Sequence, residues 1–192
     1  MRRAFRRLAC ALLLGTGLTQ AQPFHLPTAN RALLEDGGEE NFFQGTAGKP
    51  WNSGQFGCVR TEGRQFHEGV DIRCLQRDRR GEPTDPVLAS ADGTVAYLNA
   101  KPSRSNYGNY LVLRHSVHGL EVYTLYAHLS AFEPGIRIGK PVRAGQRIAT
   151  MGRTANTRQA ITKDRAHVHF EINLVINERY SAWHAATLKG LR

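Results

Sequence analysis

The segment from His167 to Asn173 alternates between apolar and polar side chains, which is the pattern of a half-buried β-strand. Its apolar set, continued by the next residue, is Val168, Phe170, Ile172 and Leu174, and its polar set is His167, His169, Glu171 and Asn173. The two imidazoles lie about 7 Å apart on one side of such a strand. Imidazole is the commonest side-chain metal ligand and the usual general base near neutral pH. This face therefore favours a functional site, although two histidines on one strand are about equally typical of a plain polar surface.

Two other segments carry side chains of related chemistry. His67 and Asp71 share one side of an extended segment, with Gly69 between them, and glycine removes bulk where another group approaches the backbone. Imidazole and carboxylate are ligands that Zn²⁺ accepts in catalytic sites, where three protein ligands leave one position open. His128 ends an alternating run that starts at Leu120, a place from which a side chain can face a cleft. In isolation, the first segment is better explained as a solvated loop and His128 as a strand-end histidine bonded to a carbonyl.

Taken together and in order, these segments resemble the lysostaphin-type zinc metallopeptidases, also called LytM-type or β-lytic endopeptidases, which cut bacterial cell-wall peptides. The resemblance is carried by His-x-x-x-Asp at His67, Tyr-Ala-His-Leu-Ser at Tyr126 and His-Val-His-Phe-Glu-Ile at His167. It runs from about Phe56 to Asn173 and includes connecting segments such as Tyr-Gly-Asn-Tyr at 107–110.

The resemblance implies a role for each of five side chains. His67, Asp71 and His169 would bind one Zn²⁺ per chain. His128 and His167 would lie beside the metal as catalytic residues, one as the general base and the other stabilising the oxyanion. The implied function is that of a zinc metalloendopeptidase that hydrolyses peptide bonds in peptidoglycan, in stem cross-links or interpeptide bridges.

Short predicted strands separated by turns rich in glycine and proline occupy most of the chain. They cover residues 86–90, 94–98, 110–115, 120–128 and 146–151, and they are followed by the strand that begins at His167. Such a series is typical of an all-β domain. The resemblance implies in addition that antiparallel β-sheets form a groove over the zinc site.

The chain divides into three predicted parts. Residues 1–21 are predicted to be a secretory signal peptide, with four arginines, an apolar run from Leu8 to Leu14 that is too short to span a membrane, and cleavage near Ala21. Residues 22–50 contain several prolines and glycines and predict an irregular N-terminal arm or linker. Residues 51–192 are expected to form the catalytic domain. We therefore expect an exported protein, periplasmic or secreted, without a membrane span.

Cys58 and Cys74 are the cysteines left after removal of the leader. Two cysteines in an exported domain are expected to form one disulfide. The bridge would close a loop of roughly 15 residues, worth about 3 kcal/mol in the chain-entropy model. It would rigidify the segment that carries His67 and Asp71. The alternative is two free thiols.

The formal charge of +10 falls to about +6 when the four leader arginines are removed. A basic exported protein is attracted to anionic polymers, and peptidoglycan with its acidic stem peptides is one of them. Nucleic acid fits on charge alone, but no aromatic-basic nucleic-acid motif accompanies the charge, so we do not expect it as a partner.

Two other functions are compatible with parts of the sequence. A catalytically inactive LytM-type domain could bind the wall or activate another cell-wall hydrolase through a regulatory protein partner, but such relatives typically lack ligands and every ligand position here is filled. A lipoyl or biotinyl carrier shares the half-barrel pattern of residues 86–95 and 139–149 but has its modified lysine in a hairpin that this chain lacks. The chain also departs from the family in the long polar loop 152–166, which bears on substrate preference.

Overall fold

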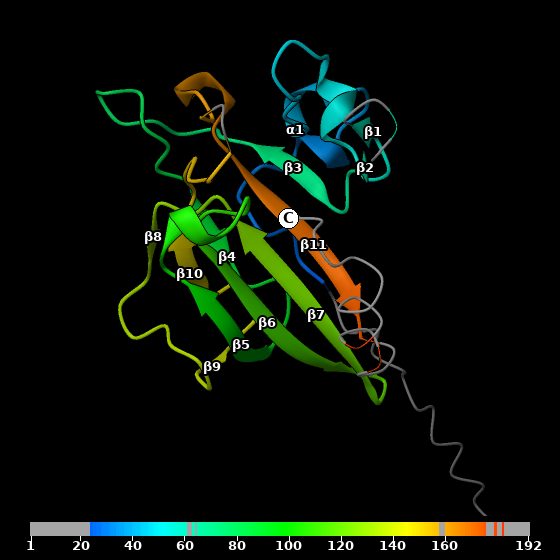
Figure 1. Cartoon of the computed structure of the whole chain (residues 1–192), viewed down its shortest axis with the longest axis vertical. Helices are drawn as coiled ribbons and strands as arrows, with labels where there is room; N and C mark the ends of the chain where they lie inside the picture. Colours follow the sequence, from blue (N-terminus) through cyan, green and yellow to red (C-terminus); the bar gives the residue numbers. More distant parts are fainter. Residues whose placement is uncertain are drawn as a thin grey trace, which may run out of the picture.

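The structure is a computed structural model that describes residues 24–60, 63, 65–157, 160–175, 179 and 182. The predicted signal peptide lies outside the described residues. The main element is a six-stranded sheet (Figure 1). Its strands, in spatial order, are β3 (Val70–Arg73), β11 (His167–Leu174), β7 (Leu120–Ala127), β6 (Tyr110–Val117), β5 (Gly93–Asn99) and β9 (Pro141–Val142).

Two smaller sheets and several short helices complete the described fold. The three-stranded sheet has the order β4 (Pro86–Leu88), β10 (Arg147–Thr150) and β8 (Ala131–Phe132), and the small hairpin joins β1 (Val59–Arg60) to β2 (Gln65–Phe66). The helices are η1 (Ala32–Leu34), α1 (Glu39–Phe42), η2 (Trp51–Gly54), η4 (Pro102–Arg104) and η5 (Lys163–Arg165). The pairings between these strands are all antiparallel, so the prediction of an all-β domain with antiparallel sheets is confirmed.

The hairpin of β6 and β7 forms where alternation predicts it. Val117 pairs with Leu120, so only His118 and Gly119 form the turn, and both have positive φ angles, 50° and 81°. Two-residue turns of this kind match the twist of the flanking strands. His115, near the turn, lies 2.8 Å from the Asp92 carbonyl and 2.7 Å from the Thr124 hydroxyl, which holds it inside the sheet.

The hydrophobic core lies between the main sheet and the three-stranded sheet. Both sheets contribute fully buried side chains, among them Leu111, Leu113 and Val168 from the main sheet and Val87 and Ile148 from the smaller one. Because side chains alternate along a strand, the residues between these positions point to the outer face. On β3 and β11 that outer face carries the histidines and the aspartate of interest.

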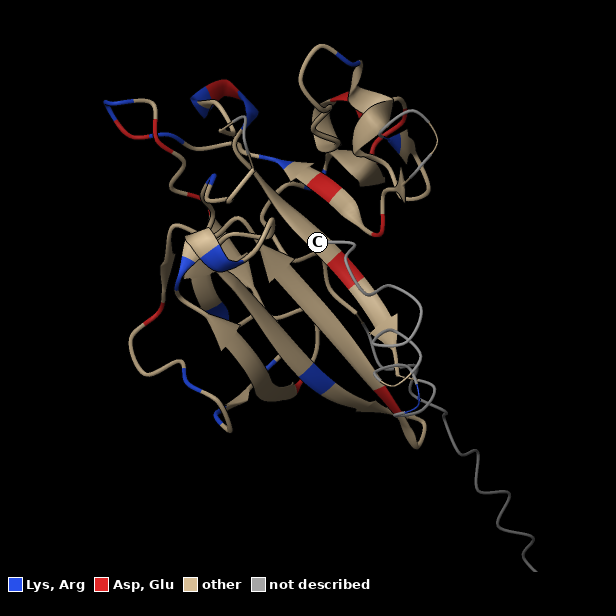
Figure 2. Cartoon of the chain, viewed as in Figure 1, with Lys and Arg blue, Asp and Glu red and all other residues tan. Residues whose placement is uncertain are grey.

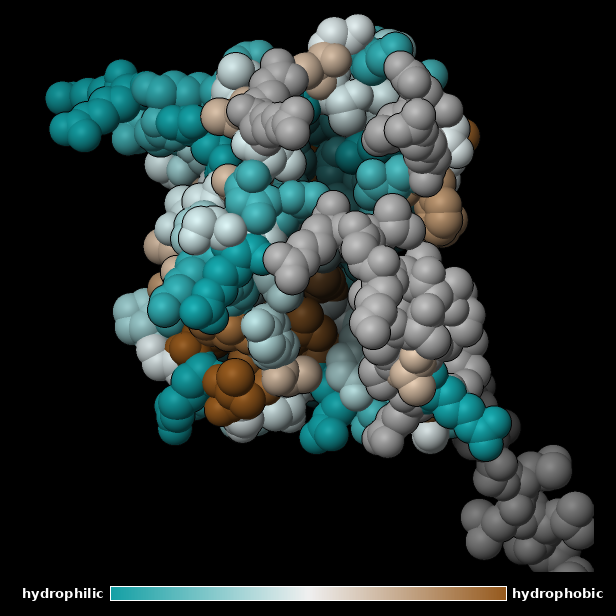
Figure 3. All heavy atoms as spheres, viewed as in Figure 1, coloured by the Kyte–Doolittle hydropathy of each residue, from teal (hydrophilic) through white to brown (hydrophobic). Residues whose placement is uncertain are grey.

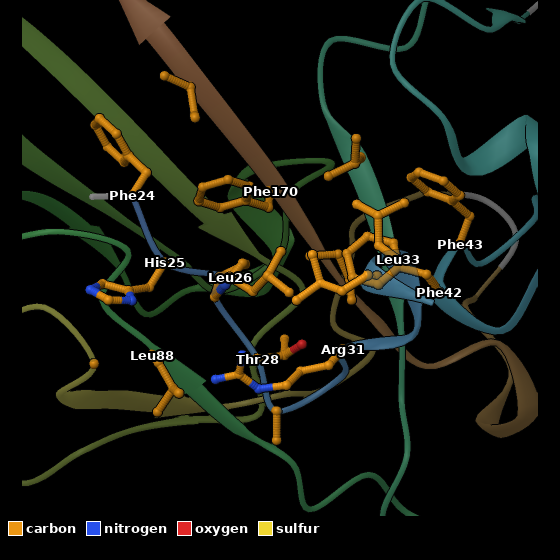
Figure 4. Close-up of a pocket in the computed structure, with 17 residues that line it drawn as sticks. Phe24, His25, Leu26, Thr28, Arg31, Leu33, Phe42, Phe43, Leu88 and Phe170 are labelled. Atoms are coloured by element: carbon orange, nitrogen blue, oxygen red, sulfur yellow. The ribbon is translucent and has the colours of Figure 1, made fainter. Parts of the chain in front are cut away.

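The N-terminal arm wraps the edge of the main sheet. Phe42 and Phe43 are 1% and 7% exposed and belong to the core, and Phe43 forms a bridge with Ile72 of β3. Between the arm and the inner face of β3 and β11 lies a largely apolar cavity of about 690 Å³, which Phe24 and Leu26 of the arm and Phe170 of β11 line from two sides (Figure 4). The arm therefore backs the strands that carry the polar face.

The predicted disulfide is wrong: Cys58 and Cys74 are both free. Cys74 follows β3 on the side of Ile72, and its buried thiol donates to the Asp85 carboxylate at 3.1 Å. Burial and this carboxylate raise the pKa of Cys74 to about 11. Cys58 precedes the β1–β2 hairpin and is half-buried, with its Sγ 3.9 Å from the Val59 carbonyl, so the two thiols have different surroundings. The disulfide was predicted from the expected export of the protein and from the spacing of the two cysteines. Neither indicates the direction in which each thiol points.

Opposite charges join the long loop before β11 to the loop between β3 and β4. Arg153 donates two hydrogen bonds to Glu82, at 2.8 and 3.0 Å, and Lys163 lies 3.3 Å from the same carboxylate. The hydrogen bonds from Arg153, with those of Lys163, lower the pKa of Glu82 to about 2. Elsewhere, lysines and arginines are spread over loops and strands (Figure 2). In the part of the chain that the structure describes, no helix has the length and apolar character needed to cross a membrane.

Candidate metal centre

Register brings two of the predicted ligands together. β11 pairs with β3 so that His169 lies directly opposite Asp71, and both point to the outer face. His67 comes from the short connection between β2 and β3. Gly69 in this connection has no room for a side chain, because a Cβ there would lie 2.3 Å from the Phe170 carbonyl and 3.0 Å from His169 Nε2. The close approach of this connection to β11 thus requires glycine.

The donor atoms of these three side chains converge on one point. His67 Nε2 lies 3.1 Å from Asp71 Oδ1 and 2.9 Å from His169 Nδ1, and the latter two atoms are 2.9 Å apart. All three residues are at most 4% exposed. Two imidazole nitrogens and one carboxylate oxygen form a donor set that suits Zn²⁺. The surface is hollowed beside the β1–β2 hairpin (Figure 3).

The outer nitrogen of each imidazole is fixed by an acceptor. His67 Nδ1 lies 2.9 Å from the Gln55 carbonyl, and His169 Nε2 lies 2.8 Å from Glu171 Oε1. Because these oxygens can only accept, the outer nitrogens carry the protons and donate. In the neutral ring the inner nitrogen then keeps its lone pair for a cation, as in metal-ligating histidines.

Glu171 is itself held by two further donors. The Tyr107 hydroxyl donates to Oε1 at 2.6 Å, and the Asn173 amide donates to Oε2 at 2.8 Å. Burial and the contact with Glu171 raise the pKa of Tyr107 far above its usual range. The tyrosine therefore stays protonated and acts as a donor. This chain of contacts orients the His169 ring through its outer nitrogen, Nε2.

The pKa shifts of Asp71 and His169 indicate that the centre favours a positive charge. Burial alone would raise the pKa of Asp71, but the electrostatic interaction with His167 and hydrogen bonds from His169 and His67 hold it well below its usual range. Burial opposes charge on His169 too, but its hydrogen bonds to Asp71 and Glu171 raise its pKa to about 9. Near neutral pH and without a cation, His169 thus carries a second proton, directed at Asp71. A metal ion would replace that proton.

A second pair of histidines lies beside the first set. The rings of His128 and His167 are 4.8 Å apart between centroids, and His167 Nε2 lies 3.6 Å from Asp71 Oδ1. Each presents its Nδ1 to a backbone carbonyl, His128 to that of Thr154 at 2.8 Å and His167 to that of Arg165 at 2.6 Å. Burial and the closeness of the His167 imidazole lower the pKa of His128 to about 3, and burial lowers that of His167. Both rings are therefore neutral, with Nε2 free to accept a proton.

The backbone of His128 is left-handed, with φ of +61°. This conformation is rare for residues other than glycine. Two loop hydrogen bonds hold it, from His128 N to the Tyr107 carbonyl and from Leu129 N to the Asn109 carbonyl, at 2.8 and 3.0 Å. Strained backbone of this kind occurs at functional sites.

The structure thus places all five predicted site residues in one cluster, His67, Asp71 and His169 at its centre and His128 and His167 beside them. Two contributors were not predicted. Tyr107 belongs to one of the connecting segments of the resemblance, which was a usable signal. Arg60 donates from Nη2 to Asp71 Oδ2 at 2.9 Å, and nothing in the local sequence pattern indicates this contact.

Comparisons with known proteins agree with this geometry. The family model described as Peptidase family M23 matches residues 65–181. DD-carboxypeptidase/endopeptidase Mpg of Neisseria meningitidis serogroup B is 34% identical over 110 residues, 57% of this chain and 20% of Mpg. The murein hydrolase activator NlpD of Escherichia coli is 32% identical over 106 residues, 55% of this chain and 22% of NlpD. The matched stretch thus spans about a fifth of the length of these relatives.

Among solved structures, the SpoIIQ–SpoIIIAH pore-forming complex contains a similar fold. The match has a TM-score of 0.50 at 19% identity and covers 80% of this chain and 85% of that one. At this identity the likeness concerns the fold alone. It agrees with the antiparallel architecture described above.

Proposed function

Because the chain belongs to peptidase family M23, we propose that it is an exported zinc metalloendopeptidase that hydrolyses peptide bonds of bacterial peptidoglycan. One observation supports this above others: two imidazole nitrogens and one carboxylate oxygen meet at 2.9–3.1 Å, and the outer polar atom of each of the three side chains is hydrogen bonded to another group. A site prepared in this way is typical of a resident metal ion.

In this proposal, His67 Nε2, Asp71 Oδ1 and His169 Nδ1 would hold one Zn²⁺. When bound, zinc would supply a Lewis acid that acidifies water and polarises the scissile carbonyl. The chain's own residues prepare this chemistry by fixing the tautomers of His67 and His169 and by burying the centre.

His128 and His167 are proposed to move protons beside the centre. Each ring is neutral and has its Nδ1 hydrogen bonded to a carbonyl, so each can accept a proton only at Nε2. The imidazole that accepts a proton from water acts as the general base, and the resulting N–H can later donate to the leaving amine. The other histidine is the proposed donor to the developing oxyanion: its Nε2 would first take up a proton from solvent water and then donate the resulting N–H.

The proposed location and partners follow from the leader and the charge. Residues 1–21 would direct export to the periplasm or the outside, where peptidoglycan peptides are the substrate. The relative Mpg is described as a carboxypeptidase and endopeptidase. Its description supports a wall peptide as the substrate class.

A second candidate function is activation of another cell-wall hydrolase without catalysis. It is favoured by the 32% identity to NlpD, which is described as a murein hydrolase activator. Against it stands the complete set of donors at the centre and the two neutral histidines beside it. A regulatory protein partner would be needed for this role.

Metal analysis combined with digestion of peptidoglycan tests the proposal. The purified protein is expected to contain one zinc per chain and to release fragments with new peptide termini, which mass analysis would identify. Removal of the metal with a chelator is expected to abolish release, and added zinc to restore it, because the donors are pre-positioned. Zinc without cleavage would favour the activator function, and absence of zinc would remove the metal roles of His67, Asp71 and His169.

Glu171→Ala is expected to weaken zinc binding by about 10–100-fold, since loss of such outer partners typically has this effect. The variant removes the acceptor of His169 Nε2–H and leaves the Tyr107 hydroxyl without its partner. Competition with a chromophoric chelator measures the affinity. Glu171→Gln is the matched control, because its amide oxygen can still accept from His169, and we expect a smaller loss. Equal affinity for the alanine variant and the unaltered protein would exclude this orienting role.

A further inference from the structure

Arg60 occupies a position that the proposed reaction does not yet use. It lies at the end of β1, paired with Gln65 of β2, so the hairpin directs it toward β3. Its Nη2 donates to Asp71 Oδ2 at 2.9 Å and to the Ser53 carbonyl at 3.0 Å. The side chain is 26% exposed, and that of Asp71 is 5% exposed.

The two oxygens of Asp71 have separate partners. Oδ1 faces the nitrogens of His67 and His169, whereas Oδ2 faces Arg60. A carboxylate with no partner on its second oxygen could rotate or offer both oxygens to a cation. We propose that Arg60 is a positioning residue that holds Asp71 so that only Oδ1 is available to the metal; this inference rests on the proposed zinc function.

The surroundings of Arg60 fit this role. Its buried Nε has no hydrogen-bond partner among the described residues, where the contacts of the guanidinium are those of Nη2 with Ser53 and Asp71. A guanidinium presents its donors in a fixed planar fork, whereas an ammonium is a point charge on a flexible stem. Arginine can therefore link the Ser53 carbonyl and the Asp71 carboxylate in one geometry, and lysine would reach these acceptors less rigidly.

If Arg60 acted only through its charge, its removal would change the zinc affinity in the opposite direction from that expected for a positioning residue. A fixed positive charge beside a metal ligand repels a divalent cation, so its removal would tighten zinc binding. Positioning predicts weaker binding on removal, because Oδ2 loses its partner and the carboxylate is no longer fixed. The sign of the change in affinity therefore separates the two.

The test uses the full chain with Arg60→Met, Arg60→Lys and, as a matched control, Arg114→Met. Arg114 also lies near a carboxylate, that of Glu121 at 3.6 Å, but toward the turn end of the β6–β7 hairpin. Chelator competition is expected to show zinc binding about 10–100-fold weaker in Arg60→Met, a smaller loss in Arg60→Lys and no change in the control. The visible spectrum of the cobalt-substituted protein reports the ligand geometry, and we expect it to change in Arg60→Met alone.

Each outcome bears on the inference. Weaker zinc binding with an altered cobalt spectrum supports positioning by Arg60. Unchanged or tighter binding in Arg60→Met, with the unaltered protein binding zinc, overturns it and leaves the proposed function standing. Failure of the unaltered protein to bind zinc overturns both. If Arg60→Met does not fold, the inference is decided by Arg60→Lys, whose zinc affinity must be lower than that of the unaltered protein.

Discussion

Replacing His169 with alanine is expected to abolish zinc binding and peptidoglycan hydrolysis together. His169 Nδ1 is one of three donors at the proposed metal position, and it lies 2.9 Å from both of the others. Loss of an outer partner of a ligand already weakens metal binding about 10–100-fold, so loss of the ligand itself should weaken it by more than about 100-fold. Zinc content after dialysis and release of wall fragments measure the two effects.

The interpretation of this variant depends on its fold. His169 is buried between Asp71 and Glu171 and bonds both, so alanine also removes the imidazole that lies between these two carboxylates. Circular dichroism and thermal unfolding should therefore accompany the metal analysis. His25→Ala, in the N-terminal arm, is the control for loss of a histidine and should keep both zinc and activity. A folded His169→Ala protein with full zinc content would remove His169 from the ligand set.

Replacing His128 with alanine is expected to separate binding from turnover. The His128 ring lies 6.1 Å from that of His169 and outside the group of three donors, so zinc content should not change. Loss of a general acid or base typically lowers the rate by about 10²–10⁴-fold, and we expect the hydrolysis rate of His128→Ala to fall within this range. The comparison requires equal zinc loading of both proteins.

Two results would argue against this role. Hydrolysis at the normal rate by a zinc-loaded His128→Ala protein would exclude His128 from the reaction. Loss of zinc from a folded variant would show that His128 acts on the metal and not on protons. Alanine retains a Cβ and thus the same backbone restriction as histidine, so the substitution tests the imidazole and leaves the left-handed turn in place.

Local patterns predicted much of the fold. Apolar and polar side chains alternate every two residues in β11, β6 and β7, and the turn at His118 and Gly119 joins β6 to β7. Such signals need only a few neighbouring residues. Even so, Ile172 and Leu174, predicted to face the core, are 54% and 63% exposed among the described residues. Alternation predicts which side of a strand each side chain points to. It does not predict over what length another layer of the protein covers that side.

Long-range relations could not be predicted in the same way. The opposition of His169 and Asp71 depends on the register between strands almost 100 residues apart. The contact between Arg60 and Asp71 depends on how the β1–β2 hairpin, whose strands are two residues long, folds over the edge strand β3. The same limit explains the wrong disulfide, since Cys74 bonds Asp85 on the inner side of β3. The five residues were predicted as site residues because a family resemblance supplied relations that one sequence does not contain.

The left-handed backbone at His128 has a cost in folding stability. For a side chain with a Cβ, this conformation is less favourable by about 1–2 kcal/mol, whereas glycine adopts it freely. If position 128 served only to turn the chain, glycine would be the more stable choice. If His128 has the proposed catalytic role, the chain forgoes stability to aim its imidazole, and a descendant without that reaction would become more stable by losing this side chain.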